Sequence, residues 1–234
     1  DNPPPPSWPN ETPTNIRCAV AVAVVTTCLY VATLHPHVPG GDSGELIAAS
    51  HQLGVAHPPG YPLFCLTSKL LASMVGYGTV AWRVNLASAV SGGGAAGMVY
   101  LAAVREVKDT WISLFSAGLF ALNPVVWRYS TQAEVFPLNN LLCACLLHLT
   151  LTFFDTPHPP TARLGAVVIG LAMTNQHTAI LFAAPLALGV LVRSRGGLLR
   201  PWELTLLLLS TMIGLAPLLY LPAASAVSPY VSWG

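Results

Sequence analysis

The side chains best suited to acid–base chemistry are concentrated between residues 35 and 62, in the stretch HPHVPGGDSGELIAASHQLGVAHPPGYP. Asp42 and Glu45 are three residues apart, a spacing that places both carboxylates on one face of a helix. Four histidines lie in the same stretch, and the last of them, His57, begins a proline-rich turn. A carboxylate or a histidine within about 3 Å of a hydroxyl can accept its proton, so this stretch could supply a general base.

Further candidate residues lie beside long apolar runs elsewhere in the chain. Arg83 precedes one such run, Arg128 and Glu134 lie in NPVVWRYSTQAEVFP, and His177 lies in TNQHT. An arginine can hold a phosphate through charge-assisted hydrogen bonds, and a histidine or a carboxylate can bind a hydroxyl. These residues are therefore candidates for contact with a phosphate or with a hydroxyl.

Several of these residues also have a purely structural interpretation. Asp42 could only cap a helix, since a short side-chain oxygen satisfies the free N–H groups there. Glu134 precedes an expected helix start, where an acidic residue suits the helix dipole. Arg128 follows Trp127, and such a pair often anchors a helix at the membrane interface. His177 could be a hydrogen-bonded core histidine.

The composition indicates an integral membrane protein. Of the 234 residues, 53% are hydrophobic and only 8% are charged, whereas a soluble domain carries about 25% charged residues. The net charge of +1 leaves no basic stripe for a nucleic acid, so no nucleic-acid partner is expected. No CxxC pair or HExxH spacing occurs, so we expect neither a metal site nor a disulfide framework.

The apolar runs predict about seven transmembrane helices. The fifth run has only 11 residues, so residues 164–192 could instead form one long broken helix, which would give six crossings. We favour seven, because the polar TNQHT segment would otherwise lie at mid-membrane depth, where such groups are costly. The predicted spans are Ile16–Leu34, Leu86–Val104, Trp111–Val126, Val135–Phe154, Leu164–Thr174, Thr178–Val192 and Leu204–Leu221.

The loop after the first span is long and should carry two short helices on the membrane surface. Residues 45–52 are helical in composition, and Glu45 could merely orient its neighbours there. The HPPGYP segment breaks that helix, because proline fixes φ and lacks an N–H donor, and His57 could simply support this turn. Residues 63–74 form an apolar run containing Lys69, which is typical of an interfacial helix.

Charge placement sets the expected orientation. With seven spans, the N-terminus and every second loop share one side, and that side receives seven of the ten lysines and arginines. The positive-inside rule makes it cytosolic, so the first loop should be lumenal or extracellular. Residues 1–15 are proline-rich and polar, which predicts a disordered cytosolic tail. The seven basic residues are Arg17, Arg105, Lys108, Arg163, Arg193, Arg195 and Arg200.

Five segments of the chain resemble a known family. These segments are GGDSGELIAASHQLGVAHPPGYPLF, AWRVNLASAVSGGGAAGMVYL, STQAEVFPLNNLL, GLAMTNQHTAILF and LYLPAASAVSPYVSWG. They are similar to the transmembrane protein 260 family, within the GT-C superfamily of membrane glycosyltransferases. The resemblance implies an all-α GT-C-type helical bundle over residues 16–234. The family carries a motif like NWG where this chain has SWG, and its larger members have a lumenal C-terminal region, so we expect a truncated catalytic module.

The resemblance also implies a function. It predicts transfer of a sugar, expected to be mannose, from a polyprenyl (dolichyl) phosphate donor to Ser or Thr hydroxyls of lumenal proteins in the endoplasmic reticulum. The superfamily keeps a catalytic carboxylate in the first lumenal loop, which falls on Asp42, with Glu45 beside it. We expect direct displacement with inversion, no cofactor and no metal. The remaining donor-phosphate and substrate-binding candidates are Arg128, His177, Glu134, His57 and Arg83.

Two other functional classes remain open. A small-molecule transporter would place ionisable groups in mid-span or show two related halves. Only His148 and His177 approach mid-span, and no halves match. A catalytically silent GT-C-like membrane subunit is the stronger alternative, and it would not depend on the carboxylates of the first loop.

Overall fold

The described part of the chain is helical. The computed structural model describes residues 12–227 and residue 232, and within them the one β-type pairing is an isolated bridge between Val55 and Ser232. The predicted disordered tail falls mostly on residues 1–11, which lie outside the described residues. The helices are α1 (Pro13–Ala32), α2 (Ser43–Gln52), α3 (Pro62–Met74), α4 (Val80–Val107), α5 (Thr110–Ala121), α6 (Pro124–Ser130), α7 (Val135–Asp155), α8 (Pro159–Asn175), η2 (His177–Ala179), α9 (Ile180–Arg193), η3 (Gly197–Leu199), α10 (Pro201–Gly214), η4 (Ala216–Leu219) and α11 (Tyr220–Ala226).

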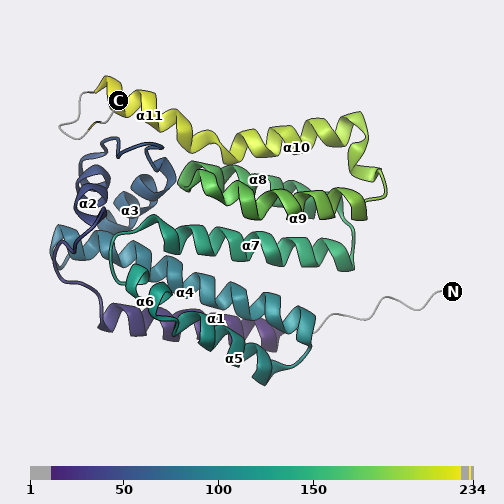
Figure 1. Ribbon diagram of the computed structural model, residues 1–234, viewed down its shortest axis with the longest axis horizontal. Coiled ribbons are helices and arrows are strands. Elements are labelled where there is room, and N and C mark those ends of the chain that lie inside the picture. Colours follow the sequence, from purple (N-terminus) through teal and green to yellow (C-terminus); the bar gives the residue numbers. More distant parts are fainter. Residues whose placement is uncertain (1–11, 228–231, 233–234) are drawn as a thin grey trace.

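The long helices run back and forth between two ends of the bundle (Figure 1). One end carries α2, α3, α6 and α11, and we call it the α2–α3 end. The chain enters at the opposite end, and α4 and α7 finish there. Helix α4 contacts both α1 and α7, and α8 contacts both α7 and α10. This alternation is the arrangement that an all-α membrane bundle requires, and it confirms the predicted fold class.

The predicted number of seven crossings is not confirmed. Among the described helices, α1, α4 and α7 are long and apolar enough to cross a membrane. Two bent pairs raise the number to five if each counts as one span: α5 with α6, bent by 64°, and α10 with the segment through α11, bent by 46°. Residues 164–192 are not one long helix, because the chain reverses at Gln176 and α9 runs back beside α8.

The third predicted span is interrupted. The apolar run from Trp111 to Val126 was expected to be continuous, but α5 ends at Ala121 and α6 begins at Pro124. The Asn123 side chain accepts hydrogen bonds from Val125 N at 2.9 Å and from Val126 N at 3.4 Å, so it caps the new helix. A strong cap followed by proline at the first helical position starts a helix there despite the apolar surroundings.

Helix α4 packs against α1 through glycines. A Cβ atom at Gly93 would lie 2.7 Å from the carbonyl oxygen of Ala23, and one at Gly97 would lie 2.8 Å from that of Ala19. Real Cβ atoms do not approach backbone this closely, so only glycine allows the two helices to lie so near. The SGGGAAG run (residues 91–97) is therefore a helix-packing segment.

The two short helices of the first loop are both present. Helix α2 begins two residues before the predicted 45–52, and α3 begins one residue before the predicted 63–74. Arg83 joins α3 to α4: its Nη1 donates to the carbonyl oxygens of Ala72 at 3.4 Å and Val75 at 3.2 Å. These bonds satisfy carbonyls at the C-terminus of α3, where a positive side chain is also favoured by the helix dipole.

Candidate active site

The segment between α1 and α2 is held against α4 and the turn after α6. The buried Asn85 donates from Nδ2 to the carbonyl oxygens of His35 at 2.8 Å and His37 at 3.3 Å. The hydroxyl of Thr79 donates to the carbonyl of Pro36 at 2.8 Å, and His35 N donates to that of Thr131 at 3.0 Å. These bonds give a polar, proline-containing segment a defined position just before Asp42.

The carboxylate of Asp42 is not used to cap α2. Asp42 stands at the N-cap position, yet its side chain accepts no cap hydrogen bond, and the residue is exposed. Its backbone carbonyl instead accepts from Leu46 N at 3.0 Å. The preceding Gly41 has φ +73°, a left-handed conformation that other residues rarely adopt, and this turn directs the chain into α2. The carboxylate is thus left available at the surface of the α2–α3 end.

Glu45 is held by His57 through two hydrogen bonds. The backbone N–H of His57 donates to Glu45 Oε1 at 2.5 Å, and His57 Nδ1 lies 2.9 Å from Glu45 Oε2. A carboxylate only accepts, so Nδ1 carries a proton. The Tyr61 hydroxyl lies within hydrogen-bonding distance of Nε2, at 3.1 Å. We call Glu45, His57 and Tyr61 the α2 clamp, because they fix the loop that follows α2 to its first turn.

Glu134 carries the buried carboxyl group among the candidate carboxylates Asp42, Glu45 and Glu134. It directly precedes α7 and is 6% exposed. Its backbone is fixed by Ser88 of α4, whose hydroxyl accepts from Glu134 N and donates to Glu134 O, both at 3.2 Å. Its Oε1 accepts from Gln132 Nε2 at 3.4 Å and lies 3.9 Å from where a Cβ on Gly41 would be. The carboxyl therefore faces the backbone immediately before Asp42.

The electrostatics of Glu134 link it to the neighbouring charges. Burial, and then the negative charge of Asp42, raise the pKa of Glu134 to about 7. The hydrogen bond from Gln132 and the positive charges of Arg128 and His57 act in the opposite direction and lower this pKa. At neutral pH the carboxyl is therefore divided between its protonated and ionised forms, which suits a group that accepts or donates a proton.

Tyr61 lies near all three carboxylates. Burial raises the pKa of its hydroxyl, and the charges of Asp42, Glu45 and Glu134 raise it further. Tyr61 is at the N-cap of α3 with φ +45°, and its ring packs edge-on against His57 at 5.0 Å between centroids. The hydroxyl thus stays protonated at ordinary pH and can act only as a neutral hydrogen-bonding group.

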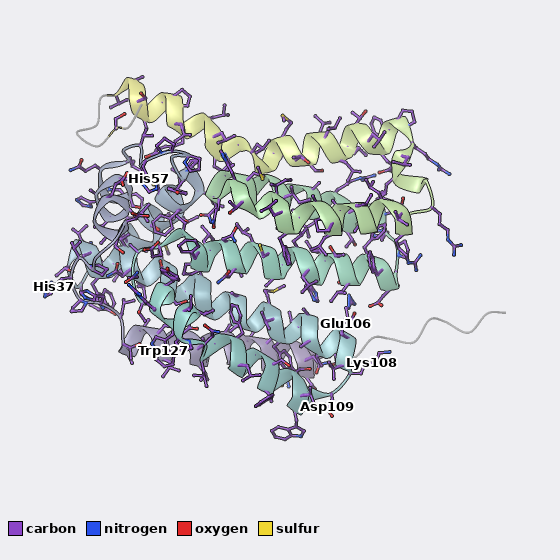
Figure 2. All side chains as sticks on the ribbon, in the orientation of Figure 1. His37, His57, Glu106, Lys108, Asp109 and Trp127 are labelled. Carbon is purple, nitrogen blue, oxygen red and sulfur yellow. The ribbon has the colours of Figure 1, made fainter. Side chains whose placement is uncertain are left out.

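Arg128 places a positive charge near Glu134. It lies in α6, is exposed and acts on Glu134 electrostatically. The preceding Trp127 fixes α6 to the end of α1, because its Nε1 donates to Thr33 Oγ1 at 3.0 Å and its ring packs against Tyr30 at 5.6 Å. Trp127 therefore anchors α6, whereas Arg128 remains exposed. Figure 2 labels Trp127 and, near the α2–α3 end, His57.

The other two candidates, His177 and Arg83, lie at the same end, but in the described part of the chain they make no hydrogen bond or ion pair with these carboxylates. His177 is exposed in the turn between α8 and α9. Asn175 Nδ2 donates to the carbonyl of Val135 at 3.0 Å, so this turn lies beside the start of α7. Arg83 donates its hydrogen bonds to carbonyl oxygens at the end of α3. Among the described residues, no group of three or more His, Cys, Asp or Glu side chains is arranged to hold a metal ion.

Some residues of the site were not anticipated from the sequence. Tyr61 could have been predicted to contact His57, since a tyrosine four residues after His57 in HPPGYP can reach back to the imidazole. Asn85 could also have been singled out, because it is a lone amide at the start of an apolar span. Ser88 and Gln132 had no distinguishing feature, because serine is common in membrane helices and a glutamine in a loop is unremarkable.

The last helix also reaches this end of the molecule. The Tyr220 hydroxyl donates to the carbonyl of Gly54 at 2.6 Å, and Val55 forms a parallel bridge with Ser232. Both contacts fall in the loop between α2 and His57. Most of the closing SWG segment, residues 233–234, lies outside the described residues.

Comparison with known proteins identifies the family. The model of the Protein O-mannosyl-transferase TMEM260 N-terminal domain matches residues 42–197, which contain Asp42, the α2 clamp, Arg128, Glu134 and His177. The mouse protein named Protein O-mannosyl-transferase TMEM260 is 39% identical over 222 residues, covering 91% of this chain and 31% of the relative.

A second relative has a slightly lower sequence identity. The Dictyostelium discoideum protein named Protein O-mannosyl-transferase tmem260 is 35% identical over 238 residues, covering 94% of this chain and 29% of the relative. This chain thus spans about a third of the length of these relatives. No solved structure matches it. The resemblance drawn from the sequence motifs is confirmed, and the chain belongs to the protein O-mannosyl-transferase TMEM260 N-terminal domain family.

Proposed function

We propose that this chain is the catalytic module of a membrane protein O-mannosyltransferase. It transfers mannose from a polyprenyl (dolichyl) phosphate donor to Ser or Thr hydroxyls of acceptor proteins. The reaction takes place at the α2–α3 end, on the lumenal side of the endoplasmic reticulum membrane, with the N-terminus in the cytosol. The names of the two relatives support protein O-mannosylation. The donor and the orientation rest on the superfamily resemblance and on charge placement.

The observation that carries this proposal is the Asp42 carboxylate. It is exposed and makes no capping hydrogen bond to the helix that it precedes, and both Asp42 and Arg128 act electrostatically on the buried carboxyl of Glu134. A carboxylate that served only as a cap would be bonded to the first turn of α2. An ionised carboxylate left unbonded at the membrane interface is instead placed to accept a proton from a substrate hydroxyl.

The reaction is a single displacement. Asp42 accepts the proton of the acceptor hydroxyl as its oxygen forms a bond to the anomeric carbon of mannose. The bond between that carbon and the phosphate oxygen breaks, and polyprenyl phosphate leaves with the electron pair. Attack from the face opposite the leaving group inverts the anomeric configuration. Arg128 stabilises the departing phosphate by a charge-assisted hydrogen bond, which contributes about 1.5–3 kcal/mol.

The other residues have supporting roles. Both carboxylate oxygens of Glu45 are held by His57, so Glu45 positions the loop beside Asp42 and does not take part in proton transfer. Glu134 lowers the cost of bringing an anionic donor near Asp42 whenever it is protonated. His177 lies in the turn beside α7 and is available to bind the sugar or the acceptor. Arg83 maintains the junction of α3 and α4.

The substitution Asp42→Asn tests the base assignment. Asparagine keeps the size and the capping ability of aspartate, so folding and membrane insertion should persist. We expect transfer from a labelled polyprenyl phosphate mannose to a Ser/Thr peptide to fall by about 10²–10⁴-fold in the full-length protein. The matched control is Asp109→Asn, because Asp109 is also an N-cap acid, with Oδ1 accepting from Ile112 N at 2.8 Å, and it lies at the opposite end.

The control should keep full activity. If Asp42→Asn also kept it, Asp42 would not be the base, and Glu134 would be the next candidate. If neither variant nor the unaltered protein showed any transfer, the chain would instead be a catalytically silent subunit.

A further inference from the structure

A second polar site lies at the opposite end of the bundle, in the turn between α9 and α10. Arg193 ends α9, and Arg195 and Gly196 follow with φ +48° and +84°. Two successive left-handed residues reverse the chain sharply before η3 and the start of α10. Arg195 and Arg200 are exposed on this turn, which we call the arginine turn (residues 193–200).

The arginine turn borders a cavity. The cavity has a volume of about 220 Å³ and lies between the arginine turn and the turn that joins α7 to α8. Its floor is formed by the buried side chains of Phe153 and Leu198. Pro157 and Pro159 line one side, and Ser194 and Arg200 line the other. The cavity therefore has an apolar floor and a basic rim.

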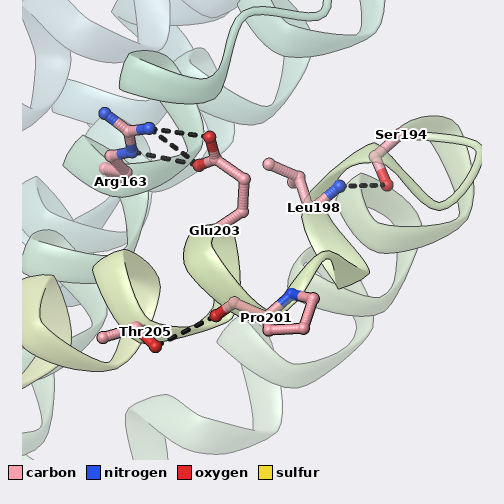
Figure 3. Close-up of polar contacts among 6 residues, drawn as sticks. All are labelled: Arg163, Ser194, Leu198, Pro201, Glu203 and Thr205. Carbon is pink, nitrogen blue, oxygen red and sulfur yellow. Dashed lines mark hydrogen bonds and ion pairs between the residues drawn. The ribbon is translucent and has the colours of Figure 1, made fainter.

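The acidic residue at this cavity is already neutralised. Glu203 is held by Arg163 through both carboxylate oxygens, with Nη2 at 2.9 Å and 2.8 Å and Nε at 3.3 Å (Figure 3). Arg105 forms an ion pair with Asp155, whose Oδ2 lies 3.2 Å from Arg105 Nε. Among the described residues, the side chains of Arg195 and Arg200 have neither an ion pair nor a hydrogen bond. Arg200 lines the cavity, Arg195 is exposed on the same turn, and Arg193 of that turn donates from Nε to the carbonyl of Phe154 at 3.0 Å.

The surroundings of the cavity are those of a membrane interface. Trp202 is 69% exposed at the first turn of α10, and Val192 and Leu199 are also exposed. An exposed tryptophan beside apolar side chains is typical of the level at which lipid headgroups lie. A molecule in the cavity would thus have its polar part beside the arginines and its apolar part along α9 and α10.

We infer that the arginine turn and this cavity bind the phosphate headgroup of an anionic phospholipid. Arg200, which lines the cavity, and Arg195, which is exposed on the same turn, bind the phosphate, and Ser194 also lines the cavity. A general excess of positive charge on one side of the membrane needs no cavity and no particular pair of arginines. Here Arg105 and Arg163 are paired with acidic residues, whereas Arg200 lies at a cavity between helices, which is where basic pockets hold lipid headgroups.

Lipid binding by the purified full-length protein tests this inference. The protein in detergent is mixed with phosphatidylglycerol or phosphatidylcholine of the same acyl chains, and bound lipid is counted by native mass spectrometry. We expect phosphatidylglycerol to bind about 30-fold more tightly, since each of two arginines near an anionic headgroup contributes about fivefold. The double variant Arg195→Gln/Arg200→Gln should lose this preference, and Arg195→Lys/Arg200→Lys should keep most of it.

The matched control removes the same charge from the same end. Arg17→Gln/Lys108→Gln lies outside the arginine turn and should keep the preference. Equal binding of the two lipids by the unaltered protein, or an equal loss in the control variant, would overturn the inference. Inorganic phosphate that displaced phosphatidylglycerol at equal concentration would also overturn it, because the site would then recognise a free ion and not a lipid. Circular dichroism of every variant shows that the helices are intact.

Discussion

Replacement of Glu134 by glutamine should make the protein more stable at high pH. The pKa of this carboxyl rises from about 4.5 in an unfolded chain to about 7 in the folded protein, first because it is buried and then because Asp42 is near. Between these two values the unfolded chain releases a proton that the folded chain keeps. The free energy of unfolding of the natural protein therefore falls as the pH rises from about 4.5 to about 7.

The size of the effect follows from the shift. One pKa unit corresponds to about 1.4 kcal/mol, so ionisation of Glu134 costs the folded state about 3 kcal/mol at pH 8. Glu134→Gln removes this cost, because the amide is neutral at every pH and resembles the protonated acid in shape. At pH 5 the variant and the natural protein should differ by less than about 1 kcal/mol, and at pH 8 the variant should be more stable by up to about 3 kcal/mol.

Denaturant unfolding in detergent at pH 5, 6, 7 and 8 measures this difference. Glu106→Gln is the control, since Glu106 is an exposed residue at the opposite end and its replacement should give the same small difference at each pH (Figure 2). A difference between Glu134→Gln and the natural protein that did not change with pH would refute the reasoning. Asp42→Asn should move the transition of the natural protein to lower pH, because the Asp42 charge raises the pKa of Glu134.

Three further predictions concern the clamp, the packing and the orientation. Glu45→Gln leaves the Asp42 carboxylate in place but loses the ionic bonds to His57, so mannosyl transfer should fall by about tenfold. Glu45→Asp should restore part of this activity. An effect of Glu45→Gln as large as that of Asp42→Asn would make Glu45 catalytic. Gly97→Val should destabilise the protein by about 1–3 kcal/mol in thermal unfolding, since its side chain would meet the backbone of α1; Gly118→Val, which has open space, is the control. Cysteines introduced at the exposed Gly76 and Thr156 should react with an impermeant reagent from opposite sides of the membrane, and labelling of both from one side would contradict the proposed orientation.

The sequence predicted those parts of the fold that depend on local pattern. The boundaries of α2 and α3 follow from glycine and proline at their ends, and the reversal at TNQHT follows from the cost of polar groups at mid-membrane depth. The break at Asn123-Pro124 was also readable, since a capping residue followed by proline starts a helix, but the apolar character of the run obscured it. Helix length alone could not settle the number of crossings, because bent pairs count as one span or as two.

The candidate site was predicted less completely, because its contacts join distant segments. The sequence identified Asp42 as a carboxylate in a polar loop, but it could not show whether the helix would use that side chain as a cap. Glu45 and His57 are 12 residues apart, and only the fold of the intervening turn makes them partners. Arg83 had the charge of a phosphate ligand, yet its nearest acceptors turned out to be the free carbonyls at the end of α3.

The hydrogen bond between Tyr220 and Gly54 has a consequence for biosynthesis. Its two residues are 166 positions apart, so the loop between α2 and His57 cannot form this hydrogen bond until α11 has been synthesised. At translation rates of about 5–20 residues per second, this delay is roughly ten to thirty seconds. A nascent chain can therefore insert most of its helices before this loop is held in place, and the α2–α3 end is complete only after nearly all of this region has left the ribosome.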